Sequence, residues 1–483
     1  MMEDQVKLRV AISSVLVIGV LAAGCSRDDT ELTSSQSSSA PSSSAAATDG
    51  LDAGAFGDLG TVCSPGDAAP VSDQTGVDGT TIHVGTFSDR GFSGRPGLTR
   101  EFHDIATAVT KWCNEHGGVR GYKIEPDLRD SALTNYAPLV VASCDDDFFL
   151  VGGGAALDDS GVKEQLKCGL PNIAGYVVSG QAAGADLTVQ PMPNPVTRVT
   201  SGDLAWLKAK YPDTIKKAAI LTADFPATIL VADRIRESAE QLGYKIVSTQ
   251  QYLPVGEANW TPFVQNLKDK GVEGVLFTGE PETLASVLKA MDNLEYRPKW
   301  IRADANIYDQ NLIKVAGDAA DLPVYANDFF FPFEKAKKNP ATQQYLDLLD
   351  KYGPSDSRVA LLGLQGLSGW MLFFKSLAAC ADDGTVTRDC VYEHARATKD
   401  WTGGGLHVPT DPGSGVTPEC FALAKTTPDG FEFPKVTGFG TSDLADFFTC
   451  NPDFVVALKG DYPAGAKCRS GKADPLPSHC ASP

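Results

Sequence analysis

Cys25 is the residue whose sequence context indicates its chemistry most clearly, because it follows a stretch with the layout of an N-terminal export signal. Two basic residues precede an apolar stretch over residues 10–23, and small residues lead directly into Cys25. This is the layout of a bacterial lipobox, in which the signal is removed and the cysteine thiol receives diacylglycerol. We expect residues 1–24 to be a lipoprotein signal peptide and Cys25 to be the lipidated N-terminus. The alternative is an uncleaved anchor, but the stretch is shorter than the ~20 apolar residues that span a bilayer.

A polar linker follows Cys25. Residues 26–50 are almost entirely Ser, Ala, Thr and Asp. Such a segment has too little apolar surface to offset the entropy of ordering it. We therefore expect residues 25–60 to tether a folded region to the outer surface of the bacterial cell membrane, and residues 456–483 to form a C-terminal extension that contains cysteines.

Ten cysteines remain besides Cys25, an even number that suggests up to five disulfides in an exported chain. None of them has the CxxC spacing of a zinc or redox motif. Spacing along the chain favours Cys144–Cys168 and Cys380–Cys390, then Cys420–Cys450. The weaker candidates are Cys63–Cys113 and Cys468–Cys480.

Catalytic and metal-binding motifs are missing from the sequence. It has no Gly-x-Ser-x-Gly elbow, no His-Glu-x-x-His and no phosphate-binding P-loop, and its six histidines show no i,i+4 pairing. We expect no enzyme activity, no metal and no cofactor. The net charge of −19 argues against nucleic-acid binding, which needs a basic surface.

Buried strand patterns alternate with helical patterns from residue 80 onward. The first run begins with the strand Thr81–Phe87 and a helix over about Leu98–Glu115, and a second run begins at Ala218. This alternation predicts parallel sheets flanked by helices, and two runs predict two α/β lobes. A late β-hairpin is expected around Pro428-Asp429-Gly430.

Several segments, in order, resemble the type I periplasmic binding proteins of the branched-chain amino acid and amide receptor group. The markers are the opening strand Ile82–Gly85, the turn Asn114–Ile124 with its Gly-Gly-Val-x-Gly pattern, Cys144 and Cys168 around the third strand, and the step over Leu267–Thr278. The resemblance covers roughly residues 80–455.

The resemblance implies a Venus-flytrap fold in which two lobes close over one small ligand. The first lobe would take residues 61–198 with 328–410, and the second residues 199–327 with 411–455. It also implies a monomeric substrate-binding lipoprotein that delivers its ligand to the permease of an ABC importer. A lipoprotein that reports the ligand to a membrane partner is the alternative.

Ligands of open α/β sheets bind at the carboxyl ends of the strands, so the loops that follow the strands carry the candidate binding residues. The glycines could instead form tight turns, the aromatic residues could pack in the core, and Asp304 could cap a helix. The candidates are Ser88, Arg90, Phe92, Gly154, Ala155, Ala156, Tyr176, Val177, Asp224, Phe225, Glu280 and Asp304.

The sequence departs from the amino acid receptors of this group at two positions. Those receptors offer Ser or Thr hydroxyls to the ligand α-carboxylate where this chain has Ala155-Ala156 and Tyr176-Val177. Asp304 falls near the acidic residue that holds the ligand amine. We therefore expect a small polar or amine-bearing ligand other than a standard α-amino acid; an amide, a polyol and an apolar carboxylate are further alternatives.

Overall fold

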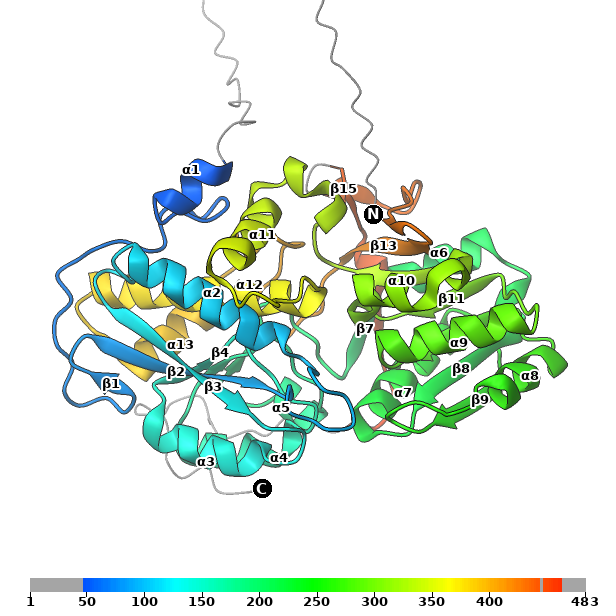
Figure 1. Cartoon of the computed structure of the whole chain (residues 1–483), viewed down its shortest axis with the longest axis horizontal. Coiled ribbons are helices and arrows are strands. Elements are labelled where there is room, and N and C mark those ends of the chain that lie inside the picture. The colour runs from blue at the N-terminus through cyan, green and yellow to red at the C-terminus, as the bar shows by residue number, and fades with distance from the viewer. Residues whose placement is uncertain (1–46, 444–445, 463–483) are drawn as a thin grey trace, which may run out of the picture. The chain divides into compact units, whose positions relative to one another are not determined.

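The computed structural model describes residues 47–443 and 446–462, which contain two mainly parallel β-sheets with helices on their faces (Figure 1). The helices are α1 (Ala47–Asp52), α2 (Glu101–Glu115), α3 (Tyr136–Asp146), α4 (Asp159–Lys167), α5 (Gly180–Ala183), α6 (Gly202–Lys210), α7 (Pro226–Gln241), α8 (Thr261–Asp269), α9 (Pro281–Asn293), α10 (Gln310–Ala316), α11 (Pro340–Tyr352), α12 (Leu361–Asp382) and α13 (Arg388–Ala397). The short 3-10 helices are η1 (Thr214–Lys217), η2 (Ala305–Ile307), η3 (Gly317–Asp321), η4 (Phe333–Lys338) and η5 (Pro452–Phe454).

The first sheet is formed by the N-terminal strands in the order β3-β2-β4-β5-β6, all parallel, with β1 added antiparallel to β2. Its strands are β1 (Val77–Asp78), β2 (Thr81–Ser88), β3 (Lys123–Asp130), β4 (Phe149–Val151), β5 (Asn172–Ile173) and β6 (Thr188–Val189). The order of the strands reverses at β2, since β3 lies on one side of it and β4 on the other.

The second sheet repeats this pattern in the order β9-β8-β10-β11-β12, all parallel, and then continues through the antiparallel strand β13. Its order reverses at β8 in the same way. The strands are β8 (Ala218–Ala223), β9 (Ile246–Tyr252), β10 (Gly274–Thr278), β11 (Trp300–Ala303), β12 (Val324–Asp328), β13 (Cys420–Thr427), β14 (Gly430–Glu432), β15 (Thr441–Asp443) and β16 (Phe448–Cys450). A separate antiparallel pair joins β7 (Arg198–Thr200) to β17 (Val455–Ala457).

Side chains that alternate along each strand supply two cores, one on each face of the second sheet. In β8, Ala218 and Ile220 face a cluster with side chains of α6 and α7, whereas Ala219 and Leu221 face a cluster with side chains of α8, α9 and α10. Burial on both faces explains why the strand is apolar at every position but Thr222. Together with the parallel pairing, this confirms the predicted α/β class.

The chain passes between the two sheets three times. The passages lie between β6 and β8, between β12 and α11, and between α13 and β13. The helices α11 and α12 follow the second passage and pack against α2 beside the first sheet (Figure 1). Residues far apart in sequence are thus gathered where the passages run side by side, as the hydrogen bond between the Thr200 and Thr417 hydroxyls shows at 2.9 Å.

The loop after β4 lies directly against α12. Gly152 has φ +65°, and a Cβ atom there would lie 2.6 Å from the ring of Trp370. Gly366 and Gly369 bring the helix close to the same loop, since a Cβ on Gly366 would lie 2.9 Å from the Gly152 carbonyl oxygen. Trp370 itself is fully buried. Because these glycines have no Cβ atom, α12 can pack closely against the loop that follows β4.

Four disulfides join cysteines that are near one another in sequence. The pairs are Cys63–Cys113, Cys144–Cys168, Cys380–Cys390 and Cys420–Cys450. Cys25 and the expected pair Cys468–Cys480 lie outside the described residues.

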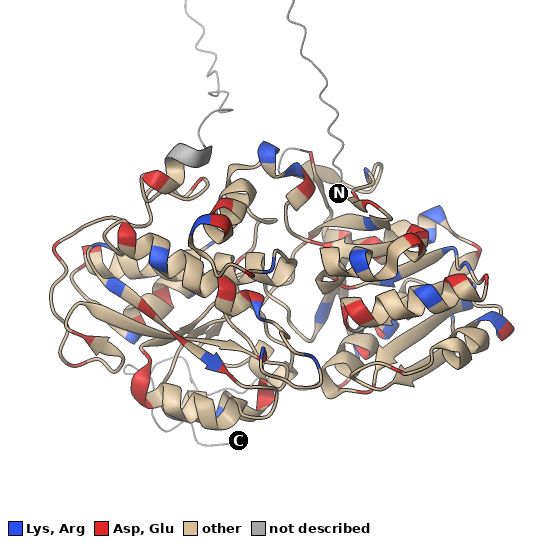
Figure 2. Ribbon diagram, viewed as in Figure 1, with Lys and Arg blue, Asp and Glu red and all other residues tan. Residues whose placement is uncertain are grey.

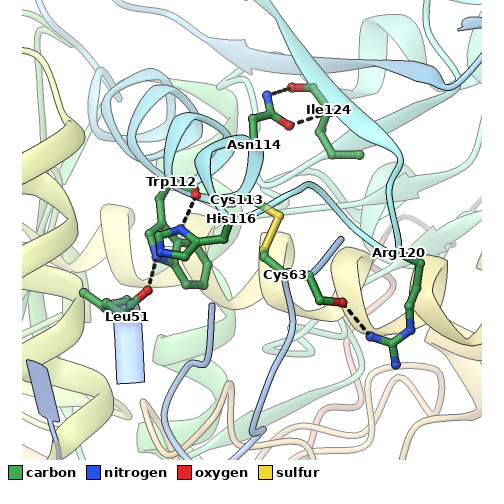
Figure 3. The surroundings of a disulfide bond; sticks show 9 residues. Leu51, Cys63, Trp112, Cys113, Asn114, His116, Arg120 and Ile124 are labelled. Atoms are coloured by element: carbon green, nitrogen blue, oxygen red, sulfur yellow. Dashed lines mark hydrogen bonds between the residues drawn. A yellow bond between two sulfur atoms is a disulfide. The ribbon is translucent and has the colours of Figure 1, made fainter. Parts of the chain in front are cut away.

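The Cys63–Cys113 disulfide holds the segment before β1 against the end of α2 (Figure 3). Next to it, the Trp112 indole N–H donates to the Leu51 carbonyl oxygen at 2.9 Å. The Asn114 amide exchanges two hydrogen bonds with the backbone of Ile124, at 2.8 and 2.9 Å. The turn that follows α2 is therefore fixed to β3 on one side and to the N-terminal segment on the other.

We expect removal of this disulfide to reduce stability more than removal of the shortest one. Cys63 and Cys113 are 50 residues apart, whereas Cys380 and Cys390 are 10 apart. Loop-closure entropy gives about 4 kcal/mol for the longer loop and somewhat under ~3 kcal/mol for the shorter one. Urea unfolding of C63A/C113A and C380A/C390A provides the comparison. Equal losses, or a larger loss in the second variant, would contradict the entropic explanation.

Over the described part of the chain, no helix has both the length and the apolar character needed to cross a bilayer. Acidic residues are spread over helices and loops around both sheets (Figure 2).

Candidate functional site

A cavity of about 700 Å³ lies where the carboxyl ends of the strands of both sheets meet. In each sheet it is bordered by loops that follow strands at and beside the reversal in strand order, which is where open α/β sheets bind ligands. The loop after β2, Ala156 after β4 and the Gly175–Val178 loop after β5 contribute from the first sheet. The loops after β8, β10 and β11 contribute from the second.

Apolar side chains make up most of the cavity wall, and aromatic rings are prominent among them. The rings come from both sheets and from the chain passages: Phe92, Tyr176, Phe225, Tyr252 and Phe329. The Tyr252 hydroxyl donates to the Thr278 carbonyl oxygen at 2.8 Å, whereas no described residue forms a hydrogen bond with the Tyr176 hydroxyl. Aromatic walls of this kind are common in small-ligand sites.

Ion pairs connect the first-sheet side of the cavity to the second-sheet side. Arg95 lies 2.8 Å from both Glu280 and Glu282. Arg358, from the loop between α11 and α12, lies 3.2 Å from Glu101 and 3.2 Å from Glu282, and also contacts Asp309. We call this set the bridging network; its members are Arg95, Glu101, Glu280, Glu282, Asp309 and Arg358.

Burial raises the pKa of three carboxyls in the bridging network, because charged groups lose solvation there. It raises the pKa of Glu101 to about 7, although Arg358 opposes the shift. The pKa of Glu280 and that of Asp309 are also raised, mainly by desolvation. The two arginines lower the pKa of the less buried Glu282. Two arginines thus only partly compensate four carboxylates.

A second charged group lies at the opposite side of the cavity, near the chain passages. Arg302 is buried and contacts Asp203 at 2.6 Å and also Asp304. Arg234 donates from one nitrogen to Asn194 Oδ1 at 3.1 Å and to two backbone carbonyl oxygens. These contacts fix α7 to the segment that joins the two sheets.

Of the candidate residues predicted from the sequence, seven line the cavity. Asp304 stands at the start of η2, but its carboxylate makes no capping hydrogen bond and turns to Arg302 instead. The lining candidates are Phe92, Ala156, Tyr176, Val177, Phe225, Glu280 and Asp304.

The other five candidates lie outside the cavity wall. Ser88 is buried and its hydroxyl lies 3.0 Å from the Thr99 carbonyl oxygen, so it holds the loop after β2. Gly154 lies under the Tyr176 ring, where a Cβ atom would be 2.5 Å from a ring carbon. Ala155 is buried in a neighbouring cluster, and Arg90 and Asp224 are exposed.

Backbone donors in the loops after β4 and β5 are occupied by two buried aspartates. The Ala156 N–H donates to Asp89 at 2.7 Å. The N–H groups of Val178 and Ser179 donate to Asp158 at 2.8 and 3.0 Å. Asp89 is fully buried and Asp158 is 4% exposed. These donors, which in such loops can bind anions, are therefore already satisfied.

Sequence reasoning missed the residues that set the charge of this site: Asp89, Asp158 and most of the bridging network. Asp89 directly follows β2, a position that the strand-end rule covers, and could have been included. Glu101, Asp309 and Arg358 follow no strand directly, and only the folded chain brings them together.

Within the described residues, Cys380, Cys390 and His394 lie close enough together to suggest a metal site. The two cysteines form a disulfide, so they offer no thiolate ligands.

Burial also raises the pKa of Asp328, at the end of β12, to about 7. One of its oxygens accepts hydrogen bonds from the N–H groups of Phe329 and Phe330, while the other is buried without a partner. An unfolded aspartate has a pKa of ~3.9, so the folded protein binds more protons between about pH 4 and about pH 7. The contribution of Asp328 to the free energy of unfolding is therefore fully present below about pH 4 and is lost as the pH rises to about 7.

We therefore expect the urea midpoint to be lower at pH 8 than at pH 5 and the D328N variant to show a smaller difference. The pKa of Glu101 is raised in the same direction, so D328N should remove only part of the pH dependence of stability. The exposed residue Asp145 supplies the control D145N. An unchanged pH dependence in D328N would show that Asp328 titrates normally.

Two doubly wound sheets connected by three chain passages, with a cavity at their strand ends, define the two-lobed fold of a type I binding protein. The sequence matches the family described as periplasmic binding protein over residues 81–430, and the chain belongs to this family. No curated protein matches the chain in sequence.

Solved structures share this fold at low sequence identity. A leucine-binding protein from Thermotoga maritima is 15% identical with a TM-score of 0.61, and the match covers 77% of this chain and 99% of that one. A fatty acid ABC transporter substrate-binding protein from Thermomonospora curvata is 17% identical with a TM-score of 0.59, covering 77% and 95%. A solute-binding protein of an ABC transporter from R. palustris, in complex with 4-hydroxybenzoate, is 17% identical with a TM-score of 0.59. This match covers 77% of this chain and 98% of that one.

Proposed function

We propose that this chain is the substrate-binding lipoprotein of an ABC importer. It captures one small polar or amine-bearing ligand between its two lobes and presents it to a permease from the outer side of the cell membrane. The observation that carries the proposal is the cavity of about 700 Å³, whose wall combines loops of both sheets. A ligand enclosed in this way would stabilise the closed arrangement, which the permease then recognises.

The bridging network supports this proposal. Arg95 comes from the loop after β2, and its partners Glu280 and Glu282 lie at the start of α9. These contacts exist only when the two sides of the cavity are close together. The structural neighbours include binding proteins for leucine, for fatty acids and for 4-hydroxybenzoate, so the fold accommodates ligands of different chemistry.

A thermal-shift screen tests the capture of a ligand. The exported chain carrying Cys25→Ser would be screened against amino acids, amides, amines, polyols, nucleosides and short carboxylates. A ligand that binds only the folded protein raises its melting temperature by mass action, by the equivalent of ~2.7 kcal/mol at 100 times Kd. Binding to one chemical class supports the proposal; no shift with any class would count against it.

Membrane fractionation tests the anchor. We expect the unaltered chain in the membrane fraction of a bacterial host and the C25S variant in the soluble extracytoplasmic fraction. Equal distribution of the two proteins would contradict lipidation at Cys25.

A further inference from the structure

The first-sheet side of the cavity has little to offer an anionic ligand. Asp89 and Asp158 accept the hydrogen bonds of the Ala156, Val178 and Ser179 N–H groups, which lie in the loops after β4 and β5. A carboxylate placed there would find these three donors already occupied and would approach two buried acidic side chains. It would lose its hydration without recovering equivalent hydrogen bonds, which is unfavourable for a charged group.

The bridging network adds an excess of negative charge between the two sides of the cavity. It contains two arginines and four carboxylates, and each arginine already contacts at least two of the acids. A full complement of ionised carboxylates would therefore leave two negative charges without a counterion. A cation bound beside them would supply the missing charge.

Glu101 is the member of the network best placed to receive such a cation. Its side chain is one of those that line the cavity, and the residue is only 3% exposed. One carboxylate oxygen contacts Arg358 at 3.2 Å, whereas the other, Oε2, is buried and has no hydrogen-bond partner. A buried carboxylate oxygen without a partner is strongly unfavourable, so a donor from a ligand would be bound well there.

The remaining wall suits the apolar part of a cationic molecule. Phe92, Tyr176, Phe225, Tyr252 and Phe329 surround the cavity from both sheets and the passages. Faces of aromatic rings attract cations as well as apolar groups. The Tyr176 hydroxyl, without a hydrogen-bond partner among the described residues, adds one polar contact.

We propose that the ligand is an apolar molecule with a cationic amine and no carboxylate, and that the amine binds at Glu101 Oε2. The carboxylate of a zwitterionic amino acid is disfavoured because Asp89 and Asp158 occupy backbone donors that could otherwise bind it. This inference rests on the proposed function and specifies its substrate class.

Arg234 is the feature that favours the opposite charge. It lines the cavity, is 4% exposed, and has a buried Nε without a partner. Its other contacts, however, are to Asn194 and to backbone carbonyl oxygens of the first passage. Burial lowers the pKa of Arg234 to about 10, and the nearby Asp304 opposes this shift. Arg234 therefore has a structural role that requires no anionic ligand.

Matched probes that differ only in charge test the proposal. The aromatic series is 3-phenylpropylamine, 3-phenylpropionate and phenylalanine; the aliphatic series is hexylamine, hexanoate and norleucine. Affinities would be measured by calorimetry with the unaltered folded protein, then with E101Q and with D145N as the control, because Asp145 is an exposed carboxylate outside the cavity wall. We expect at least one amine to bind at least tenfold more tightly than its carboxylate and zwitterion, and E101Q to weaken that binding at least tenfold while D145N leaves it unchanged.

Preference for a carboxylate or a zwitterion, or amine binding that E101Q leaves unchanged, would overturn the inference. The comparison of charge forms needs no variant, so it stands even if E101Q fails to fold. If no amine binds while another class in the thermal-shift screen does, the inference fails and the proposed function stands. If no class binds, the proposed function itself fails.

Discussion

Replacing Arg358 with methionine is expected to lower the free energy of unfolding by about 3 kcal/mol. Arg358 contacts Glu101, Glu282 and Asp309, and the side chains of Glu101 and Asp309 are 4% and 7% exposed. Removing the arginine leaves buried carboxylates without their cation, which is the unfavourable way to break a buried ion pair. Urea unfolding at pH 8, where these acids are most ionised, measures the loss.

The control is R120M, because Arg120 pairs with Asp382 at the surface and such pairs contribute at most ~1 kcal/mol. Neutralising the acids should rescue the first variant, so R358M/E101Q/D309N is expected to regain much of the lost stability. A loss below about 1 kcal/mol in R358M would mean that water compensates these carboxylates. The bridging network would then have little influence on the contact between the lobes.

The second large effect is expected for Gly152→Ala, which should destabilise the protein by about 3 kcal/mol. Two terms add: a left-handed backbone conformation disfavours a residue with a Cβ by about 1–2 kcal/mol, and overpacking a core typically adds about 1–3 kcal/mol. Gly152 has φ +65°, and its new Cβ would lie 2.6 Å from the buried Trp370 ring.

Gly271, just after α8, separates the two terms. Its φ is +60°, but a Cβ there would meet no heavy atom within 4 Å, so G271A should lose only the conformational term. Urea unfolding of both variants gives the comparison. Equal losses would show that α12 moves away from the loop after β4 without resistance, and that the close packing of Gly366 and Gly369 does not hold the helix in place.

The order of the elements could be predicted because it depends on local patterns. Alternating apolar stretches of strand and helix length predict the doubly wound sheets, and the predicted hairpin is present as β13 and β14 around Gly430. The short strands were missed. Strands β6 and β7 have two and three residues, which is too short for any periodicity to show. β6 forms by adding to the first sheet beside β5, and β7 forms by pairing with β17, which is more than 250 residues later in the chain than β7.

The site was predicted only in part, since the rule that identifies loops after strands uses nothing but strand order. It selects Phe92, Tyr176 and Glu280, which line the cavity. It cannot select Arg358, which lies between two helices and contacts Glu101 of the cavity wall because α11 and α12 pack on α2. Nor can it tell that the Ser88 hydroxyl is used within its own loop.

The four disulfides have a mechanical consequence. Cys63–Cys113, Cys144–Cys168 and Cys380–Cys390 connect segments around the first sheet, and Cys420–Cys450 connects two strands of the second. None of these four crosslinks ties one sheet to the other. Oxidation therefore constrains each sheet and its helices separately, and these four disulfides add no covalent crosslink between the two halves. Disulfides placed this way can stabilise an extracytoplasmic protein without fixing the position of one half relative to the other.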